Sequence, residues 1–372
     1  MCIRDRLIDI PMDVQKAVID FEYPEKCEIR SYKPTTKSNY VQVRRVMAAL
    51  EEAEKPLICI GGGVFAAHAE NEIRELADLM QIPVITTMMG ISVFPDDDQL
   101  FCGMIGTHGV KMANAAVNEC DVLFLVGARV GDRAVKTPLA LEKTTKIIHI
   151  DIDPAEIGKN IGADLPLVGD AKLVLQQMTE LAKPMKHDEW IAHIKTLGGE
   201  RKYVEPAKGT VNPRVFIDRL AKKMPANVTV VADVGQNQIW TCTEYKFRKE
   251  GRLLTSGGMG TMGYSVPAAI GAKMADNSRA TVAICGDGAF QMSFMELATA
   301  VQFGVDIKVV VMTNNRLGMV RELQTNGYHD RQTAVFLDGS PDFIKLAEAY
   351  GIPAMRVYDL SLIHISEPTR PY

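Results

Sequence analysis

Short apolar runs, rich in β-branched residues, alternate along the chain with segments in which apolar residues recur every three to four positions. The first pattern is typical of buried parallel strands and the second of amphipathic helices. Because the two patterns alternate, the chain is predicted to form α/β units with parallel sheets. The runs that we expect to be strands are residues 57–60, 84–86, 122–126, 147–152, 228–232, 253–255, 281–284 and 307–312.

Two polar segments with prolines, residues 22–39 and 184–209, predict linkers. The sequence therefore predicts two doubly wound parallel-sheet domains, preceded by the stub of a third α/β domain. Residues 7–39 would be the end of that earlier domain, with a last strand at 7–11, and its linker. Residues 40–183, with a long helix at 66–80, form the first complete domain. Residues 210–359 form the second, which opens with Asn212 as a helix N-cap and Pro213 at the first helical position.

The two ends of the chain carry sequence of a different kind. Residues 1–6 and 360–372 correspond, in translation, to the two orientations of one sequencing-library adapter. A match in both orientations, one at each end, is improbable by chance. We therefore exclude both segments from the fold prediction, as one would a tag, and expect the natural protein to extend beyond them.

Composition narrows the class of protein. The formal net charge is −4 over 372 residues and no basic cluster is present, which argues against nucleic-acid binding. No apolar run approaches the ~18 residues that a membrane span requires. The seven cysteines lack disulfide or metal-ligand spacing, and Cys59, Cys120 and Cys285 are expected to be reduced core residues. We expect a cytoplasmic enzyme without nucleic-acid or membrane partners.

The clearest chemical signal lies where two neighbouring strands are predicted to end. The first ends in Gly286-Asp287-Gly288, a helical segment follows, and the second ends at Asn314. A strand–helix–strand crossover makes the strands parallel, so Asp287 and Asn314 are expected at one carboxyl edge, where open α/β sheets bind ligands. Gly-Asp-Gly alone is also an ordinary turn. The paired form predicts a Mg²⁺–diphosphate site, because a carboxylate and an amide oxygen suit Mg²⁺ and glycines admit phosphate.

This arrangement resembles the thiamin-diphosphate motif of the pyruvate-decarboxylase-like enzymes. Within that group the chain is most similar to acetolactate synthase large subunits, through segments in the family's order: residues 151–154, 233–236, 256–263, 286–288 and 318–320. The resemblance implies a transferase that decarboxylates pyruvate on thiamin diphosphate and transfers the two-carbon unit to a second 2-ketoacid, for branched-chain amino-acid synthesis. It also implies a homodimer or tetramer with the active site between subunits, and a small regulatory subunit.

The resemblance assigns the second complete domain to thiamin diphosphate and Mg²⁺. Met262 would wedge the cofactor into a bent shape, although a plain core methionine is the alternative. Asn315 is the alternative to Asn314 as metal ligand, and many relatives carry histidine at the position of Asn237. The implied cofactor contacts are Gly235, Gln236, Asn237, Gly260, Met262, Gly286, Gly288 and Ala289, and the implied metal ligands are Asp287, Asn314 and the carbonyl of Arg316.

The first complete domain resembles the family's FAD site. A triple glycine after a strand admits phosphate at a helix N-terminus, but it also suits a tightly packed strand–helix turn. His108 could equally be an exposed loop residue. Gly131 stands where the family commonly has an aspartate that touches the flavin, so the sequence departs from the family at this point of the implied FAD site. The implied FAD contacts are Gly61, Gly62, Gly63, Met88, His108, Arg129, Arg133, Asp151, Ile152 and Asp170.

Three further expectations follow from the resemblance. Leu323 replaces a tryptophan that sets acceptor choice in the family, so acceptor preference is not implied. The glutamate that activates the cofactor is expected upstream of Leu7, so no catalytic residue is assigned and the chain by itself is expected to be inactive. The alternatives are another thiamin enzyme, such as a 2-ketoacid decarboxylase or glyoxylate carboligase, or a nucleotide-binding module without catalysis.

Overall fold

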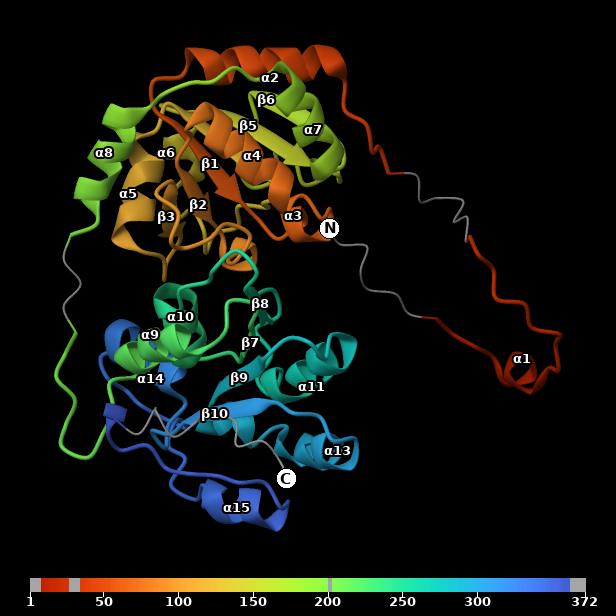
Figure 1. The fold of residues 1–372 in the computed structure, drawn as a ribbon, viewed down its shortest axis with the longest axis vertical. Helices are drawn as coiled ribbons and strands as arrows, with labels where there is room; N and C mark the ends of the chain where they lie inside the picture. Colours follow the sequence, from red (N-terminus) through yellow and green to blue (C-terminus); the bar gives the residue numbers. More distant parts are fainter. Residues whose placement is uncertain (1–7, 27–33, 200–202, 362–372) are drawn as a thin grey trace.

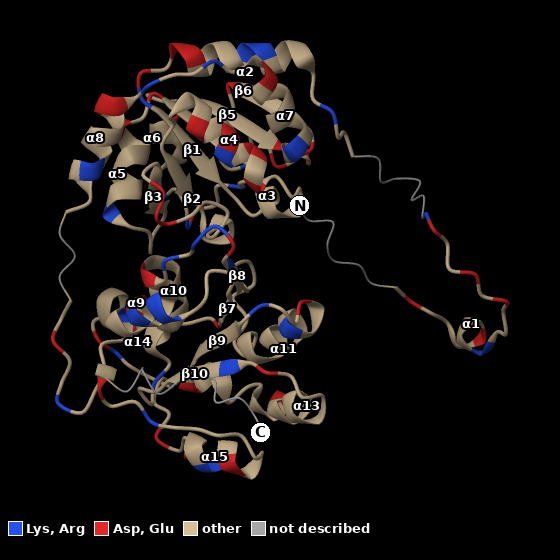
Figure 2. Cartoon of the chain, in the orientation of Figure 1, with Lys and Arg blue, Asp and Glu red and all other residues tan. Residues whose placement is uncertain are grey.

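Two parallel sheets organise the protein, one above the other in the view of Figure 1. The computed structural model describes residues 8–26, 34–199 and 203–361. The adapter-like residues 1–6 and 362–372 lie outside these ranges. Among the described residues, none of the helices is both long enough and apolar enough to cross a membrane. In Figure 2, basic and acidic residues are interspersed along the ribbon of both domains.

The upper, central domain is a six-stranded parallel sheet in the order β3-β2-β1-β4-β5-β6. This order reverses between β1 and β4, as in doubly wound dinucleotide-binding folds. Its strands are β1 Pro56–Ile60, β2 Val84–Thr86, β3 Phe101–Met104, β4 Val122–Val126, β5 Lys146–Asp151 and β6 Leu165–Val168. Its helices are α2 Tyr40–Glu52, α3 Gly63–Ala66, α4 Glu70–Met80, η1 Met88–Gly90, α5 Lys111–Glu119, α6 Pro138–Leu141, α7 Ala171–Leu181 and, after it, α8 Asp188–Leu197.

The central sheet is buried on both faces. Ile58 and Ile60 of β1 pack into one apolar cluster, whereas Leu57 and Cys59 pack into the other. Because β1 and β4 meet solvent on neither face, all their residues are apolar, which explains the continuous runs at 57–60 and 122–126. Burial raises the pKa of the Cys59 thiol to about 12, and Cys59, Cys120 and Cys285 are free and buried, as expected.

The lower, C-terminal domain is a four-stranded parallel sheet in the order β10-β9-β7-β8. Asn212 caps its first helix by accepting hydrogen bonds from the N–H groups of Arg214 and Val215, as predicted. Its strands are β7 Thr229–Ala232, β8 Arg252–Thr255, β9 Thr281–Gly286 and β10 Lys308–Met312. Its helices are α9 Pro213–Lys223, α10 Gln236–Glu244, α11 Ser265–Ala275, α12 Asp287–Phe290, η2 Phe294–Glu296, α13 Leu297–Gln302, α14 Gly318–Gly327 and α15 Phe343–Ala349.

Polar and apolar contacts join the two domains. Ile91 and Met104 of the central domain pack into the apolar core of the C-terminal domain. The Asp96 carboxylate accepts a hydrogen bond of 2.9 Å from the N–H of Phe247 and lies 3.6 Å from the Lys246 ammonium. Burial at this junction raises the pKa of Asp96 to about 6. The edges of the two sheets are therefore held in a fixed relation.

Three predictions about elements were wrong or incomplete. Residues 8–11 form no strand; Pro11 instead precedes α1 Met12–Lys16, which lies away from both sheets in Figure 1. A single strand needs neighbours to satisfy its backbone, and none of the strands in the described part of the chain pairs with this segment. The helix expected at 66–80 is divided into α3 and α4 by His68, which has a φ of 51°. Strands β3 and β6 were missed because Gly103 and Pro166 interrupt their apolar patterns.

Candidate cofactor site

Asp287 joins the ends of two neighbouring strands. β9 ends at Gly286, and the side chain of Asp287 is only 1% exposed. Its Oδ1 accepts a hydrogen bond of 2.9 Å from the N–H of Gly288. Its Oδ2 accepts hydrogen bonds of 3.0 and 2.5 Å from the N–H groups of Asn314 and Asn315, beyond the end of β10. The structure therefore brings Asp287 and Asn314 together, as the crossover predicted.

The register of the strands explains this meeting. β9 and β10 are adjacent and parallel, with Gly286 opposite Met312, so their carboxyl ends lie at the same edge of the sheet. Beyond β10 the side-chain Oδ1 of Asn314 accepts a hydrogen bond of 3.0 Å from the N–H of Arg316. An amide oxygen has a second lone pair, so this bond leaves Asn314 able to coordinate a cation. The group consists of hard oxygen donors, which fits Mg²⁺.

The backbone at Gly288 lies in a cradle formed by the side chains of Leu317, Leu337 and Met262. A Cβ atom at Gly288 would lie 2.7 Å from the Leu317 side chain and 3.4 Å from the terminal methyl of Met262. Met262 is partly buried beside the apolar cluster around α12. A residue larger than glycine at 288 would force the Leu317 side chain to move, and Met262 lies beside the predicted diphosphate site. This geometry fits a wedge and a packed core methionine equally.

The carboxylate of Asp233, which sequence reasoning treated only as part of a motif, organises the glycine-rich loop. Asp233 is completely buried at the end of β7. It accepts hydrogen bonds of 2.9, 3.0 and 2.8 Å from the N–H groups of Val234, Gly263 and Ser265. The loop that contains Gly260 and Met262 is therefore tied to the end of the sheet. The available signal was an acid directly after an apolar strand.

Helix α10 begins at this same edge. Gly235 precedes it with a φ of 136°, a conformation that favours glycine. The side chain of Asn237 is buried and donates hydrogen bonds of 2.8 and 3.1 Å to the carbonyls of Asp233 and Ile284. That side chain therefore stabilises the ends of β7 and β9. The backbone N–H groups of the first helical turn, those of Gln236 and Asn237, have no intrahelical acceptor and suit an anion.

The predicted FAD residues all follow strands of the central sheet at its carboxyl edge. Gly61, Gly62 and Gly63 follow β1, Met88 follows β2, His108 follows β3, Arg129 and Arg133 follow β4, Asp151 and Ile152 lie at the end of β5, and Asp170 follows β6. Arg129 and Arg133 are exposed. The topology thus gathers at one edge a set of residues that the sequence distributes over more than a hundred positions.

Two of the three glycines serve close packing. The N–H groups of Gly61 and Gly63 donate hydrogen bonds of 2.9 and 3.0 Å to the carbonyls of Val126 and Gly127. A Cβ at Gly61 would lie only 2.1 Å from the Gly127 oxygen. These two N–H groups already have backbone acceptors, so their geometry supports the tightly packed strand–helix turn and not direct binding of a phosphate. Gly62 is free of this constraint.

Two further predicted FAD residues carry structural contacts. The Asp170 side chain caps α7 by accepting a hydrogen bond of 3.2 Å from the Leu173 N–H. Asp151 Oδ1 accepts a hydrogen bond of 2.9 Å from the Asp153 N–H. At Gly131 an added Cβ would meet no atom within 4 Å. The space for a larger residue therefore exists at the position where the family commonly has aspartate.

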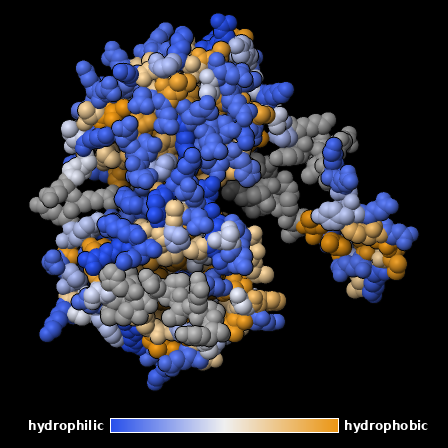
Figure 3. Space-filling view, in the orientation of Figure 1, coloured by the Kyte–Doolittle hydropathy of each residue, from blue (hydrophilic) through white to orange (hydrophobic). Residues whose placement is uncertain are grey.

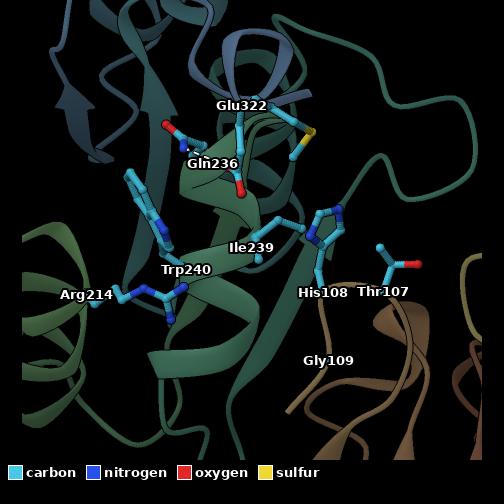
Figure 4. Close-up of a pocket in the computed structure, with 9 residues that line it drawn as sticks. Thr107, His108, Gly109, Arg214, Gln236, Ile239, Trp240 and Glu322 are labelled. Carbon is cyan, nitrogen blue, oxygen red and sulfur yellow. Dashed lines mark hydrogen bonds between the residues drawn. The ribbon is translucent and has the colours of Figure 1, made fainter. Parts of the chain in front are cut away.

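A pocket of about 250 Å³ lies between the two domains (Figure 4). His108 reaches it from the loop after β3, and Gln236 and Trp240 reach it from α10. His108 therefore faces the C-terminal domain, which the sequence did not indicate. The lining residues are Thr107, His108, Gly109, Arg214, Gln236, Ile239, Trp240, Met319 and Glu322. The pocket connects one predicted FAD residue with one predicted diphosphate residue.

Comparison with known proteins agrees with this division into domains. Residues 43–178 match the central domain of thiamine pyrophosphate enzymes, and residues 233–364 match their C-terminal TPP binding domain. The chain is 41% identical over 364 residues to the probable acetolactate synthase large subunit of Methanocaldococcus jannaschii, covering 94% of this chain and 61% of that protein. It is 40% identical over 362 residues to the acetolactate synthase large subunit of Corynebacterium glutamicum, covering 94% and 58%.

A third relative, the acetolactate synthase large subunit of Buchnera aphidicola, is 36% identical over 362 residues, which cover 94% of this chain and 63% of that protein. The chain thus spans about 60% of the length of these relatives. The first match covers β1 to β6 and the second covers β8 to β10, and all three relatives are described as acetolactate synthase large subunits. The chain belongs to the thiamine pyrophosphate enzymes and, within them, to the family of acetolactate synthase large subunits.

Proposed function

We propose that the chain forms the central and cofactor-binding domains of an acetolactate synthase catalytic subunit that uses thiamin diphosphate and Mg²⁺. In this proposal the enzyme decarboxylates pyruvate and transfers the two-carbon unit to a second 2-ketoacid. The observation that carries it is the buried carboxylate of Asp287, which bridges the ends of β9 and β10 beside the Gly288 cradle. Similarity to acetolactate synthase large subunits supports the choice of reaction.

The residues present fit this cofactor. Asp287, Asn314 and the Arg316 carbonyl would hold Mg²⁺, and the backbone from Gly286 to Ala289, with the first turn of α10, would hold the diphosphate. When bound, thiamin diphosphate supplies the nucleophilic carbon and the electron sink for decarboxylation. The chain contributes binding and orientation, since Asp287 is fixed by three backbone N–H groups and Gly260 and Met262 are fixed through Asp233.

We also propose that the carboxyl edge of the central sheet binds FAD. Support comes from the sheet order, whose reversal between β1 and β4 places Gly62, Arg129 and Arg133 at the edge where such folds bind dinucleotides. The exposed guanidinium groups of Arg129 and Arg133 suit the phosphates.

The subunit partners and the cellular location are proposed from the resemblance, and no particular acceptor 2-ketoacid is proposed. A homodimer or tetramer, a small regulatory subunit and a cytoplasmic location stay predictions from the resemblance. Leu323 lies on α14 with 58% of its surface exposed, at the position where the family usually has tryptophan.

The test uses the full-length parent protein. Calorimetric titration with thiamin diphosphate should show binding with Mg²⁺ and none after chelation of the metal. Incubation with pyruvate should then yield acetolactate. Release of acetaldehyde without acetolactate would make the protein a 2-ketoacid decarboxylase. Metal-independent binding, or none, would contradict the proposed site.

A further inference from the structure

The side-chain amide of Gln236 is held at one end by a residue that the sequence did not single out. Gln236 is the first residue of α10 and lines the pocket between the domains. Its Nε2 donates a hydrogen bond of 3.0 Å to Oε2 of Glu322, drawn as a dashed line in Figure 4. Glu322 lies on α14, one turn after the start of that helix at Gly318. The contact joins helices that are 86 residues apart in sequence.

The other end of the amide lies over Gly318. A Cβ at Gly318 would be 2.2 Å from Oε1 of Gln236 and 3.2 Å from Nδ2 of Asn314. The polar ends of Gln236 and of the predicted metal ligand Asn314 therefore meet above the same point. The φ of Gly318 is not positive, so its backbone does not require glycine, but a Cβ at this position would force the end of the Gln236 side chain to move. A larger residue would displace the amide.

The chemistry of Glu322 sets which way the amide points. An ionised carboxylate only accepts hydrogen bonds, so it selects the NH₂ end of Gln236 and turns the carbonyl end toward Gly318 and Asn314. A hydrogen bond to a charged group is stronger than one between neutral groups. Without this acceptor the amide could rotate or flip, and its carbonyl would no longer be fixed beside Asn314.

We propose that Glu322 is a positioning residue that orients Gln236 at the metal–diphosphate end of the thiamin diphosphate site. This inference rests on the proposed function, because it concerns the same cofactor site. In the part of the chain that the structure describes, the hydrogen bond of Glu322 goes to Gln236 and not to a metal ligand, so Glu322 acts through Gln236. The role predicts coupling between Glu322 and Gln236 and no general loss of stability, since Glu322 is exposed on α14.

A double-mutant cycle tests the coupling. The Kd for thiamin diphosphate at saturating Mg²⁺ is measured for the wild type, Glu322→Ala, Gln236→Ala and the double variant. Each single change should raise Kd by about 5-fold, and Glu322→Ala should have no further effect when Gln236 is already alanine. Glu322→Gln should restore most of the affinity, because its amide oxygen still accepts from Gln236. Glu348→Ala, an exposed glutamate on α15, is the matched control and should bind as the wild type.

A second variant perturbs Gln236 from the opposite side. Gly318→Ala would place a Cβ where Oε1 of Gln236 lies, and it should weaken binding to a similar extent while thermal unfolding stays unchanged. Trp240, which lines the same pocket, gives a fluorescence signal for the titrations. An undiminished effect of Glu322→Ala in the Gln236→Ala background would overturn the positioning role but leave the proposed function. Failure of the wild type to bind thiamin diphosphate with Mg²⁺ would overturn both.

Discussion

The two sheets differ in how completely their side chains are covered. In the central sheet every residue of β1 and β4 is buried, and apolar clusters pack on both faces. In the C-terminal sheet β9 is equally buried from 281 to 285, but β10 at the edge has no buried residue, and neither have α14 and α15. Figure 3 shows apolar side chains at the surface of the lower domain, and the exposed ones include Met292, Met295, Val301 and Phe303.

The two side-chain ligands of the candidate metal site follow strands that differ in packing. Asp287 follows the buried β9, whereas Asn314 follows the half-exposed β10. Ligand sites are drawn from the less stable parts of a fold, and a ligand that binds only the folded state stabilises the part it contacts. The well-packed strand β9 thus fixes the position of the charged ligand, Asp287. The loosely packed segment brings the second ligand and gains most from binding.

The largest expected effect concerns Asp287. Asp287→Ala removes the only predicted carboxylate ligand and should weaken Mg²⁺-dependent thiamin diphosphate binding by at least ~100-fold. Asn314→Ala should cost roughly 10-fold, because a water can replace a neutral ligand. Calorimetric titration with and without Mg²⁺ measures both, and Asp306→Ala, an exposed acid of the same domain, is the control. Unchanged affinity in Asp287→Ala would remove the site assignment altogether.

The difference in packing can be measured directly. Phe124→Ala in β4 should lower the free energy of unfolding by about 3–5 kcal/mol, whereas Val310→Ala in β10 should cost about 1 kcal/mol, because its surroundings are already partly open. Urea unfolding can be followed by fluorescence in each domain, since Trp190 is buried in the central domain and Trp240 lies on α10. Equal losses of unfolding free energy at the two sites would contradict the difference in packing between the two sheets.

Between the two domains, Asp96 should make stability depend on pH. Its pKa is raised by burial to about 6 from an ordinary value near 3.8, so between these values the folded state binds more protons than the unfolded state. Stability should therefore fall as pH rises from about 4 to 6, by roughly 2 kcal/mol. Asp96→Asn should flatten this decline and be the more stable protein at pH 7. The exposed neighbour Asp97 gives the control Asp97→Asn; a decline that persists in Asp96→Asn would exclude this carboxyl as its origin.

The smallest expected effect concerns the central domain's exposed edge. Arg129→Ala removes one charge-assisted contact and should reduce FAD uptake by roughly 5- to 10-fold, read from flavin absorbance after dialysis. Lys136→Ala, an exposed cation of the same loop region, should leave uptake unchanged. If the wild-type protein is colourless and binds no added FAD, the proposed flavin site is wrong, and Gly131 would mark the loss of that site.

Much of the architecture was determined by the sequence itself. The runs at 57–60, 122–126 and 281–284 all proved to be strands, because a strand buried on both faces is predominantly apolar or β-branched. The meeting of Asp287 with the backbone of Asn314 was also predictable, since a single crossover connection makes two strands parallel and aligns their carboxyl ends. The cap at Asn212 was predictable because its side-chain oxygen bonds to N–H groups two and three residues further along the chain.

Tertiary structure alone decided the remaining features. The packing of Gly61 against Gly127, the buried side chain of Asn237, and the bond from Gln236 to Glu322 join segments that are distant in sequence. The periodicity of apolar residues does not predict such contacts, because they depend on how the helices and strands pack against one another. The expected strand at 7–11 failed for the same reason over its described residues. Its apolar pattern suits a strand, but backbone hydrogen bonds require a neighbour that only the folded arrangement can supply.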